Sequence, residues 1–214
     1  MNTIIKWLIM SAAVLVGSCN VSYAKQSIIP SFALKERATL TREAQFVYGI
    51  NAPIPMLAAE IEQESGWRPN ITASDGGMGL GQFMAGTVKQ IVRSYPELGP
   101  ANPYNPTWAI RAQSRFIKWN YTRVKGKNNC ERFGATLKGY NAGLGYPQRA
   151  QKKSSDPYTW FTLTENINPG QSYKNFIYSR WYPREILFVR QKKYTAWGFN
   201  ICDINHPPYD KYPR

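Results

Sequence analysis

The chain has 214 residues, of which 43% are hydrophobic and 19% are charged. This composition is typical of a globular protein with one well-cored domain, and it excludes an intrinsically disordered chain. The net charge of +14 favours an anionic partner, such as nucleic acid, anionic lipid or an anionic cell wall. No internal apolar run is long enough to span a membrane.

The first residues resemble an export signal. Lys6 precedes an apolar run over residues 7–16, and residues 22–24 (Ser-Tyr-Ala) carry the small side chains that a signal peptidase reads. We therefore predict a signal peptide over residues 1–24 and a periplasmic protein, which argues against nucleic acid as the partner. Removal of Lys6 with this segment leaves a net charge of +13, one less than the +14 of the whole chain. Cys19 ends a Val-Gly-Ser-Cys sequence that resembles a lipobox, so a lipid anchor at Cys19 is the alternative.

The rest of the chain has helical patterning and no alternation of the strand type, so the predicted fold is mainly α. We expect helices over residues 35–48, 55–65, 82–95, 107–125, 130–141 and 173–191, the last interrupted by Pro183. The polar stretch 148–171 is expected to be irregular, and the Pro- and Tyr-rich tail is expected to be extended.

Two cysteines remain once Cys19 has been removed or lipidated. In an oxidising compartment we expect Cys130 and Cys202 to form a disulfide. Two cysteines and one distant histidine make no zinc site, and His206 lies in a proline-rich tail rather than beside a cysteine. No metal and no cofactor is therefore predicted.

Glu64 is the candidate catalytic group. On the second predicted helix, Leu57, Ile61 and Glu64 are spaced at i, i+4 and i+7, so the carboxyl group points with the apolar stripe toward the protein body. A partly buried carboxyl group tends to keep its proton, as a general acid must. Glu60, one turn earlier, adds like-charge repulsion in the same direction, whereas Glu62 is expected on the opposite, solvated face. Composition alone would make any one of these glutamates a surface residue.

A glycine-rich turn follows this helix over residues 76–82 (Gly-Gly-Met-Gly-Leu-Gly-Gln). It has neither the Gly-Lys-Ser/Thr ending of a phosphate loop nor the spacing of a dinucleotide-binding turn, so nucleotide binding is not predicted. Glycines at these positions allow the backbone to approach a ligand closely, although the segment could also be a plain flexible loop.

Three ordered motifs resemble those of the soluble-type lytic transglycosylase (SLT) domain. They are Glu64-Ser65, residues 79–84 (Gly-Leu-Gly-Gln-Phe-Met) and residues 140–143 (Tyr-Asn-Ala-Gly). Residues 182–187 (Tyr-Pro-Arg-Glu-Ile-Leu) resemble the later tyrosine-containing helix of the same family. The similarity covers about residues 52–190.

This resemblance implies a single lysozyme-like domain of the goose-lysozyme type that cleaves the β-1,4 bond between N-acetylmuramic acid and N-acetylglucosamine in peptidoglycan. Glu64 matches the family's catalytic acid, which protonates the glycosidic oxygen and then, as a base, helps the C6 hydroxyl close a 1,6-anhydro ring without water. Ser65 is expected to position Glu64 and the helix end. The residues expected to contact the substrate are Ser65, Gln82, Met84, Tyr140, Asn141 and Tyr182. The implied division is a lead-in helix over 25–50, the SLT domain over 51–200 and a tail over 201–214.

The small number of acidic residues fits chemistry with one carboxylate. Between Ser65 and Ser155 the acidic residues are Asp75, Glu97 and Glu131, and a two-carboxylate glycosidase would need a second group from this set or from farther away. We interpret Asp75 as the cap of a Ser-Asp-Gly-Gly turn, with a catalytic role as the alternative.

The sequence departs from the family pattern at three positions. Gly81 stands where the family usually has Met, and Tyr178 stands where an acidic residue often precedes the late tyrosine by four positions. Gly139 precedes Tyr140 where Ala is common. The rival functions are a hydrolytic muramidase, a non-catalytic wall-binding module and an exported nucleic-acid binder. The predicted partners are peptidoglycan glycan strands and a secretion or conjugation apparatus. The predicted role is to open the wall locally for that apparatus, and the alternative roles are general wall turnover and phage lysis.

Overall fold

The structure is a computed structural model that describes residues 28–205 and 207. The predicted signal peptide, Cys19 and most residues of the tail lie outside the described residues. The α-helices of the described part are α1 (Ser31–Tyr48), α2 (Ile54–Ser65), α3 (Ala85–Ser94), α4 (Pro106–Tyr121), α5 (Asn129–Ala142), α6 (Gly145–Lys153) and α7 (Tyr173–Arg184). Short segments of 3₁₀ or π geometry are η1 (Pro96–Leu98), η2 (Thr164–Asn166), η3 (Glu185–Val189) and η4 (Arg190–Trp197).

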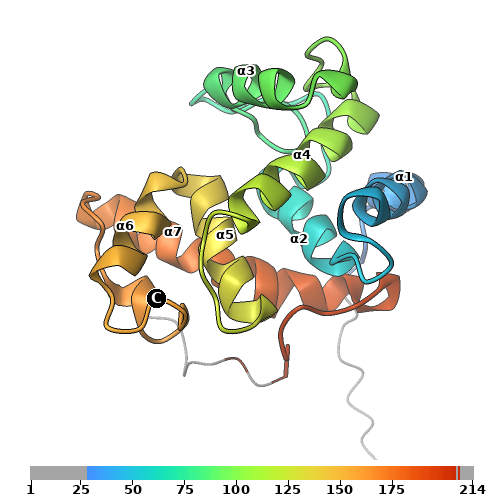
Figure 1. Ribbon diagram of the computed structural model, residues 1–214. Coiled ribbons are helices and arrows are strands. Elements are labelled where there is room, and N and C mark those ends of the chain that lie inside the picture. Colours follow the sequence, from blue (N-terminus) through green and yellow to red (C-terminus); the bar gives the residue numbers. More distant parts are fainter. Residues whose placement is uncertain (1–27, 206, 208–214) are drawn as a thin grey trace, which may run out of the picture.

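The mainly helical fold class is confirmed, since the described residues contain isolated β-bridges at Thr72, Met78 and Phe83 but no named strand. In Figure 1, α3 and the loop before it form a lobe at one end of α4, while α5, α6 and α7 lie around its other end. None of the described helices is long and apolar enough to cross a membrane.

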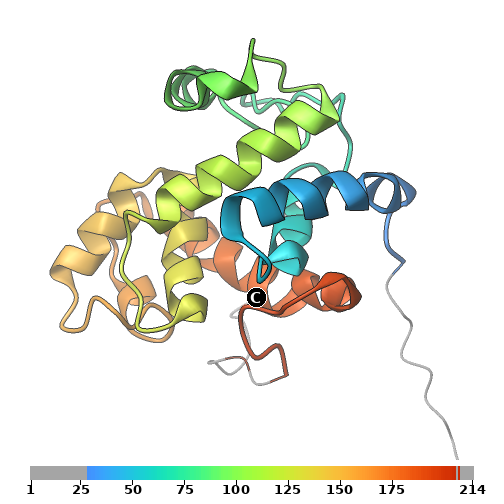
Figure 2. The same cartoon turned by 45° about the vertical axis from the view of Figure 1, so that its right-hand side comes forward.

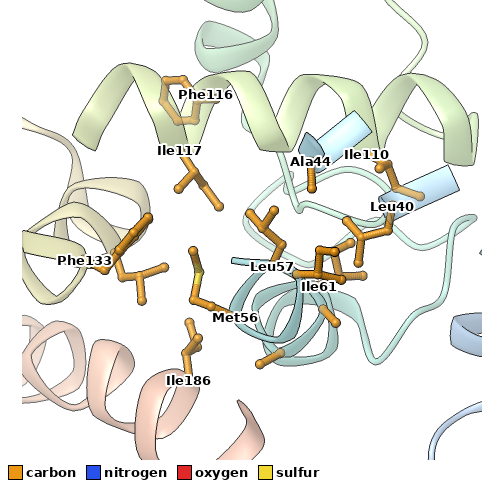
Figure 3. Packing of buried hydrophobic residues seen from close by; sticks show 14 of the residues in the cluster. Leu40, Ala44, Met56, Leu57, Ile61, Ile110, Phe116, Ile117, Phe133 and Ile186 are labelled. Atoms are coloured by element: carbon orange, nitrogen blue, oxygen red, sulfur yellow. The ribbon is translucent and has the colours of Figure 1, made fainter. Parts of the chain in front are cut away.

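Helix α2 is at the centre of the molecule. Residues 54–61 and Ser65 are buried, because α1, η3 and η4 pack around the helix. Figure 2 shows α2 behind α1, with the C-terminal segments on its other side. In Figure 3, Leu57 and Ile61 of α2 point toward Leu40 of α1 and Ile110 of α4. Each such side chain contributes roughly 1.5–3 kcal/mol by leaving water, so the helix that carries Glu64 has a firm support.

Local sequence sets several helix ends. Pro55 lies in the first turn of α2, where a missing N–H costs nothing, and Gly66 ends the helix in the left-handed conformation (φ 59°). Asn105 caps α4 by accepting from the N–H of Trp108 (3.0 Å), and Asn128 caps α5 by accepting from that of Glu131 (3.0 Å).

The structure corrects three expectations of secondary structure. The helix predicted over 82–95 begins at Ala85, because residues 79–83 form a turn that lines a groove. The stretch 148–171 is not irregular throughout: it contains the second half of α6 and all of η2. The helix predicted over 173–191 changes to a π-helical turn just after Pro183, which lies inside α7 and has no N–H to donate.

The predicted disulfide between Cys130 and Cys202 is confirmed. It joins the beginning of α5 to the segment that follows η4, across a sequence separation of 72. Since η4 packs on α2, this bond also holds the C-terminal part of the described chain against the helix of Glu64.

Candidate active site

A groove with a volume of about 290 Å³ opens beside the end of α2. Its walls come from α2, the glycine-rich turn, α3, α4, α5 and α7. Its lining residues include Gln63, Glu64, Asp75, Gly81, Gln82, Met84, Phe116, Tyr140, Asn141, Tyr178 and Tyr182.

Glu64 presents its carboxyl group to this groove from the last turn of α2. Burial raises the pKa of this carboxyl group from 4.5 to about 7; the hydrogen bond from Tyr182 opposes the shift and the charge of Asp75 adds to it. The Tyr182 hydroxyl donates to Glu64 Oε1. At neutral pH a large share of the molecules therefore holds a proton on Glu64, facing a cavity that could hold a sugar.

Glu60 lies one turn earlier and is completely buried. Burial and the charge of Glu64 raise the pKa of its carboxyl group well above the ordinary value, although hydrogen bonds from Gln113, Tyr140 and Tyr182 act against the shift. Gln113 Nε2 donates to Glu60 Oε2 and, at 3.0 Å, to the backbone carbonyl of Leu57. A protonated Glu60 is thus a neutral hydrogen-bonding partner in the core below Glu64.

Two tyrosines connect the acidic pair to the groove walls. The Tyr182 hydroxyl lies between the two carboxyl groups, bonded to Glu64 and 3.4 Å from Glu60 Oε1. Tyr140 on α5 donates to the backbone carbonyl of Gly81 (2.7 Å), so it joins α5 to the glycine-rich turn. Burial raises the pKa of both hydroxyl groups well above 10, which keeps them as donors.

The glycine-rich turn needs its glycine at position 79. Gly79 has φ +66°, and a Cβ there would lie 1.9 Å from the carbonyl oxygen of Pro103. Gln82 also has a left-handed backbone (φ 46°), and its side chain donates to the Gly79 carbonyl at 2.7 Å. Such a backbone is rare outside glycine and is often found at functional sites. Gln82 is thereby held in the groove wall beside Glu64.

The expectation that Glu62 is solvated is wrong. Its carboxylate accepts from Lys193 and from the Tyr194 hydroxyl, and it lies 3.4 Å from Arg190 Nη1. All three partners belong to η4, a segment more than 120 residues away in sequence that covers this face of α2. Helical periodicity places Glu62 opposite Glu64 correctly but cannot reveal that another element packs there.

Most of the predicted site residues meet in the groove: Glu64, Gln82, Met84, Tyr140, Asn141 and Tyr182 all line it. Ser65 does not line the groove. It is buried, and its hydroxyl donates to the carbonyl of Ile61 at 3.1 Å, within α2. That bond suits a residue that positions the helix end, while direct contact of Ser65 with substrate stays a prediction.

Asp75 lies in the turn expected of it and also lines the groove. Its Oδ1 accepts from the backbone N–H of Gly77 at 3.2 Å, as in an Asx turn, and the residue is exposed. The groove therefore has Glu64 and Asp75 as its lining carboxylates within the described residues.

Several residues of the groove could not be recognised from the sequence, among them Phe116, Tyr178 and Gln63. Phe116 lies within the helix predicted over residues 107–125, and Tyr178 is noted above only as a departure from a family pattern. Gln63 had no signal of its own; its side-chain oxygen accepts from Arg190 Nε at 2.6 Å, which fixes the amide at the groove edge. The contact that fixes Gln63 depends on the packing of η4 against α2, so the sequence alone does not reveal it.

A helical body built around a buried glutamate at a groove is the arrangement of a lysozyme-like domain. The family model of the transglycosylase SLT domain matches residues 42–161, more than half of the chain. The chain belongs to this family, so the resemblance inferred from the sequence motifs is confirmed. Comparison of the sequence with curated proteins gave no significant match.

Solved lytic transglycosylases share the fold. An inactive glutamate-to-glutamine mutant of the lytic transglycosylase Slt from Pseudomonas aeruginosa has a TM-score of 0.58 and 20% identity, over 85% of this chain and 28% of that one. The 70 kDa soluble lytic transglycosylase from Escherichia coli has a TM-score of 0.53 and 22% identity, over 75% and 24%. A 70 kDa soluble lytic transglycosylase in complex with bulgecin A has a TM-score of 0.56 and 22% identity, over 80% and 26%. The chain thus spans about a quarter of the length of these proteins.

Proposed function

We propose that this protein is a peptidoglycan lytic transglycosylase, and that Glu64 cleaves the β-1,4 bond between N-acetylmuramic acid and N-acetylglucosamine. The observation that carries the proposal is a groove-lining glutamate of an SLT-family domain, with a carboxyl pKa that burial raises to about 7. A pKa of about 7 suits a group that must give a proton and then take one at neutral pH.

In the first step, Glu64 donates its proton to the glycosidic oxygen and the bond to muramoyl C1 breaks. In the second step, the Glu64 carboxylate takes the proton of the muramoyl C6 hydroxyl, whose oxygen bonds to C1 and closes a 1,6-anhydro ring. The proton balance returns to its start and no water is consumed. The Tyr182 hydroxyl supports the first step, since it donates to the carboxylate that forms when Glu64 gives up its proton.

The glycine-rich turn holds two of the groove residues in place. Gln82 is held by Gly79, and Tyr140 is held by Gly81, so both present fixed polar groups beside Glu64. Met84 and Asn141 lie on the same walls and would contact the sugar chain. Preorganised groups of this kind need no rearrangement when substrate binds.

The product distinguishes the proposal from hydrolysis. Purified peptidoglycan is digested with the wild-type protein in H₂¹⁸O, and the fragments are weighed by mass spectrometry. A lytic transglycosylase gives anhydro-muramoyl ends that carry no ¹⁸O and are lighter than reducing ends by one whole water molecule. Reducing ends labelled with ¹⁸O would refute the transglycosylase and favour a muramidase. Glu64→Gln should digest nothing; digestion at the wild-type rate would remove Glu64 from the mechanism.

Hydrolytic muramidase activity is the second candidate because Asp75 lines the groove. A hydrolase of the two-carboxylate kind needs a second group to activate water or to bind C1. Asp75→Asn keeps the shape of the turn and removes the charge. The transglycosylase proposal expects this variant to retain most of its activity, whereas a loss as large as that of Glu64→Gln would favour the muramidase.

The proposed setting is the periplasm, reached through the signal peptide over residues 1–24 or held at the membrane through a lipid on Cys19. Mass spectrometry of the mature protein separates the two, since they leave different first residues. The proposed role is local opening of the wall for a secretion or conjugation apparatus. Loss of secretion or conjugation in a strain carrying Glu64→Gln, with normal growth and wall turnover, would support that role.

A further inference from the structure

The side-chain amide of Gln63 lies at the edge of the groove and has no part in the reaction proposed above. Gln63 lines the groove and is half-buried. It comes directly before Glu64 in the last turn of α2, and the α-carbons of neighbouring residues are about 3.8 Å apart. A polar group so close to Glu64 is well placed to contact the same stretch of glycan.

The orientation of this amide is set by Arg190. Arg190 Nε lies 2.6 Å from the side-chain oxygen of Gln63. A guanidinium group only donates hydrogen bonds, so the atom of the amide that faces it has to be the oxygen. The NH₂ group of Gln63 is therefore left on the side of the amide away from Arg190.

The NH₂ group of Gln63 keeps its donors free. Gln63 Nε2 bonds to no acceptor within the part of the chain that the structure describes, and it is not one of the buried polar atoms that lack a partner. It is therefore accessible from the groove that Gln63 lines. The positive charge of Arg190 draws electron density toward the amide oxygen, which strengthens the N–H groups as donors.

Two glutamates hold Arg190 in place. Arg190 Nε lies 3.2 Å from Glu185 Oε1, and its Nη1 lies 3.4 Å from Glu62 Oε1. Together with the Gln63 oxygen, these carboxyl groups leave the guanidinium little freedom to move. Lys193 bonds to the same Glu62 oxygen, but no hydrogen bond between described residues joins it to Gln63.

The π-helical turn η3 brings Glu185 and Arg190 together. The backbone N–H of Arg190 donates to the carbonyl of Glu185, five residues earlier, and to that of Ile186. On a regular α-helix the residues that face each other are three or four apart, so Glu185 and Arg190 would lie on different faces. Single π turns are frequent at functional sites. This turn gives Arg190 the position from which it reaches Gln63.

We propose that Gln63 is a further substrate-binding residue, which donates from its NH₂ group to an acetamido carbonyl oxygen of the glycan strand, and that Arg190 is its positioning residue. The inference rests on the proposed function, because the strand in the groove is the one that Glu64 would cleave. It gives the η3–η4 segment a role in the groove although Arg190 itself does not line it.

The acceptor is assigned from the chemistry of the strand. Both sugars at the bond that Glu64 would cleave carry an N-acetyl group, so acetamido carbonyls lie on either side of the acid. A carbonyl oxygen offers two lone pairs and has no proton of its own, whereas a sugar hydroxyl can turn its proton toward the donor. A carbonyl accepts near its own plane, and an amide that Arg190 fixes can meet it with one N–H in that direction.

Binding is measured without cleavage, with Glu64→Gln in the full chain as the parent. Calorimetry gives the affinity for a peptidoglycan tetrasaccharide freed of its peptides, and for the same tetrasaccharide after chemical removal of its acetyl groups. Gln63→Met has a similar length and no amide. It should bind the acetylated ligand roughly five- to tenfold more weakly than the parent, since one hydrogen bond is lost, and the deacetylated ligand equally well.

Gln63→Glu separates the donor from the shape of the side chain. It keeps an oxygen for Arg190 and removes the NH₂ group. The acetylated ligand should again bind more weakly, whereas the deacetylated ligand, which has an ammonium group in place of the amide, should bind at least as tightly as to the parent. The preference between the two ligands should therefore shift toward the amine.

Arg190→Met tests the positioning role. It leaves the Gln63 amide free to rotate, so the acetylated ligand should bind roughly threefold more weakly. In a chain that already carries Gln63→Met, the same change should have no further effect, because no amide is left to orient. Arg190→Lys still donates to the Gln63 oxygen and should recover most of the affinity. Losses that add independently would assign Arg190 a general structural role and overturn this part of the inference.

Lys193→Met is the matched control. Lys193 belongs to η4, as Arg190 does, and bonds to the same glutamate, Glu62. This variant should bind both ligands as the parent does. An equal loss in Lys193→Met and Arg190→Met would show that the packing of η4, and not the contact with Gln63, governs binding.

Two results with Gln63→Met would overturn the assignment of Gln63: unchanged affinity for the acetylated ligand, or an equal loss for both ligands. Urea unfolding of each variant verifies the fold; if Arg190→Met is unfolded, Arg190→Gln takes its place in the comparison. Failure of the wild-type chain to cleave peptidoglycan would refute the proposed function and leave this binding result standing by itself.

Discussion

Replacing Glu64 with Gln should abolish wall digestion and, at the same time, stabilise the fold at neutral and alkaline pH. In the folded protein the pKa of the carboxyl group is about 7, against an ordinary value of 4.5. The unfolded chain therefore loses this proton first as the pH rises. The folded state binds more protons between these two values, so the stability that the protonated form contributes falls from about pH 4.5 to about pH 7.

The size of the effect follows from the shift. One pKa unit corresponds to 1.36 kcal/mol, so the shift from 4.5 to about 7 is worth on the order of 3 kcal/mol above pH 7. Gln is neutral at every pH and can accept the hydrogen bond of the Tyr182 hydroxyl through its amide oxygen. Glu64→Gln should therefore match wild type near pH 4 and exceed it by a few kcal/mol near pH 8.

Urea unfolding of the two proteins at pH 4, 6 and 8, followed by circular dichroism, measures this difference. Digestion of labelled peptidoglycan by the same samples measures activity. A variant that is inactive and equally stable at every pH would show that Glu64 is not held in a buried site with a raised pKa. A variant that is inactive and less stable at pH 8 would show that the carboxylate contributes to the fold, contrary to the argument from burial.

Three other changes test the surroundings of Glu64. Tyr182→Phe removes the hydroxyl that favours the carboxylate form, so the pKa of Glu64 should rise above about 7 and the alkaline limb of the pH–rate profile should move up. The rate should be at least roughly tenfold lower, because the carboxylate that forms when Glu64 protonates the glycosidic oxygen has lost its hydrogen-bond donor. Glu60→Gln should unfold at nearly the same urea concentration as wild type at pH 7. Glu60→Ala should lower the free energy of unfolding by about 2–4 kcal/mol, because it opens a cavity and leaves the buried amide of Gln113 without its partner. Equal losses of stability in the two variants would mean that Glu60 is charged in the folded protein. Reduction of the Cys130–Cys202 disulfide should lower the free energy of unfolding by about 4 kcal/mol, given its sequence separation of 72. Urea unfolding with and without reductant measures this change. An unchanged midpoint would mean that the loop is already restrained in the unfolded chain.

The sequence predicted the helix of Glu64 well because its signals are local. Pro55 and Gly66 define its ends, and the spacing of Leu57, Ile61 and Glu64 places the carboxyl group on the apolar face. These features depend on backbone geometry within twelve residues. The same holds for the raised pKa of Glu64, since the apolar face of a helix in a globular chain must be covered by something.

What could not be predicted depends on which element covers which face. Glu62 is expected to be solvated on periodicity alone, but η4 covers it with Lys193 and Tyr194. Helix α6 has no apolar stripe of its own; Pro147 and Ala150 are its buried apolar residues, and Gln151 holds it through backbone hydrogen bonds to the segment after α4. Neither fact leaves a repeating pattern in the sequence, because each arises from contacts between distant segments.

The departures from the family pattern acquire a physical meaning in the groove. A Cβ at Gly81 would lie 2.6 Å from the ring of Phe83 and 2.9 Å from the hydroxyl of Tyr140, which instead donates to the Gly81 carbonyl. The wall of this groove is therefore built by bringing α5 close to the turn, where a larger residue would push them apart. Tyr178, with 57% of its surface exposed, presents an aromatic ring from α7 in place of an acidic side chain. A tyrosine in place of a carboxylate makes the groove less negative, which suits the anionic wall polymer of the proposed function.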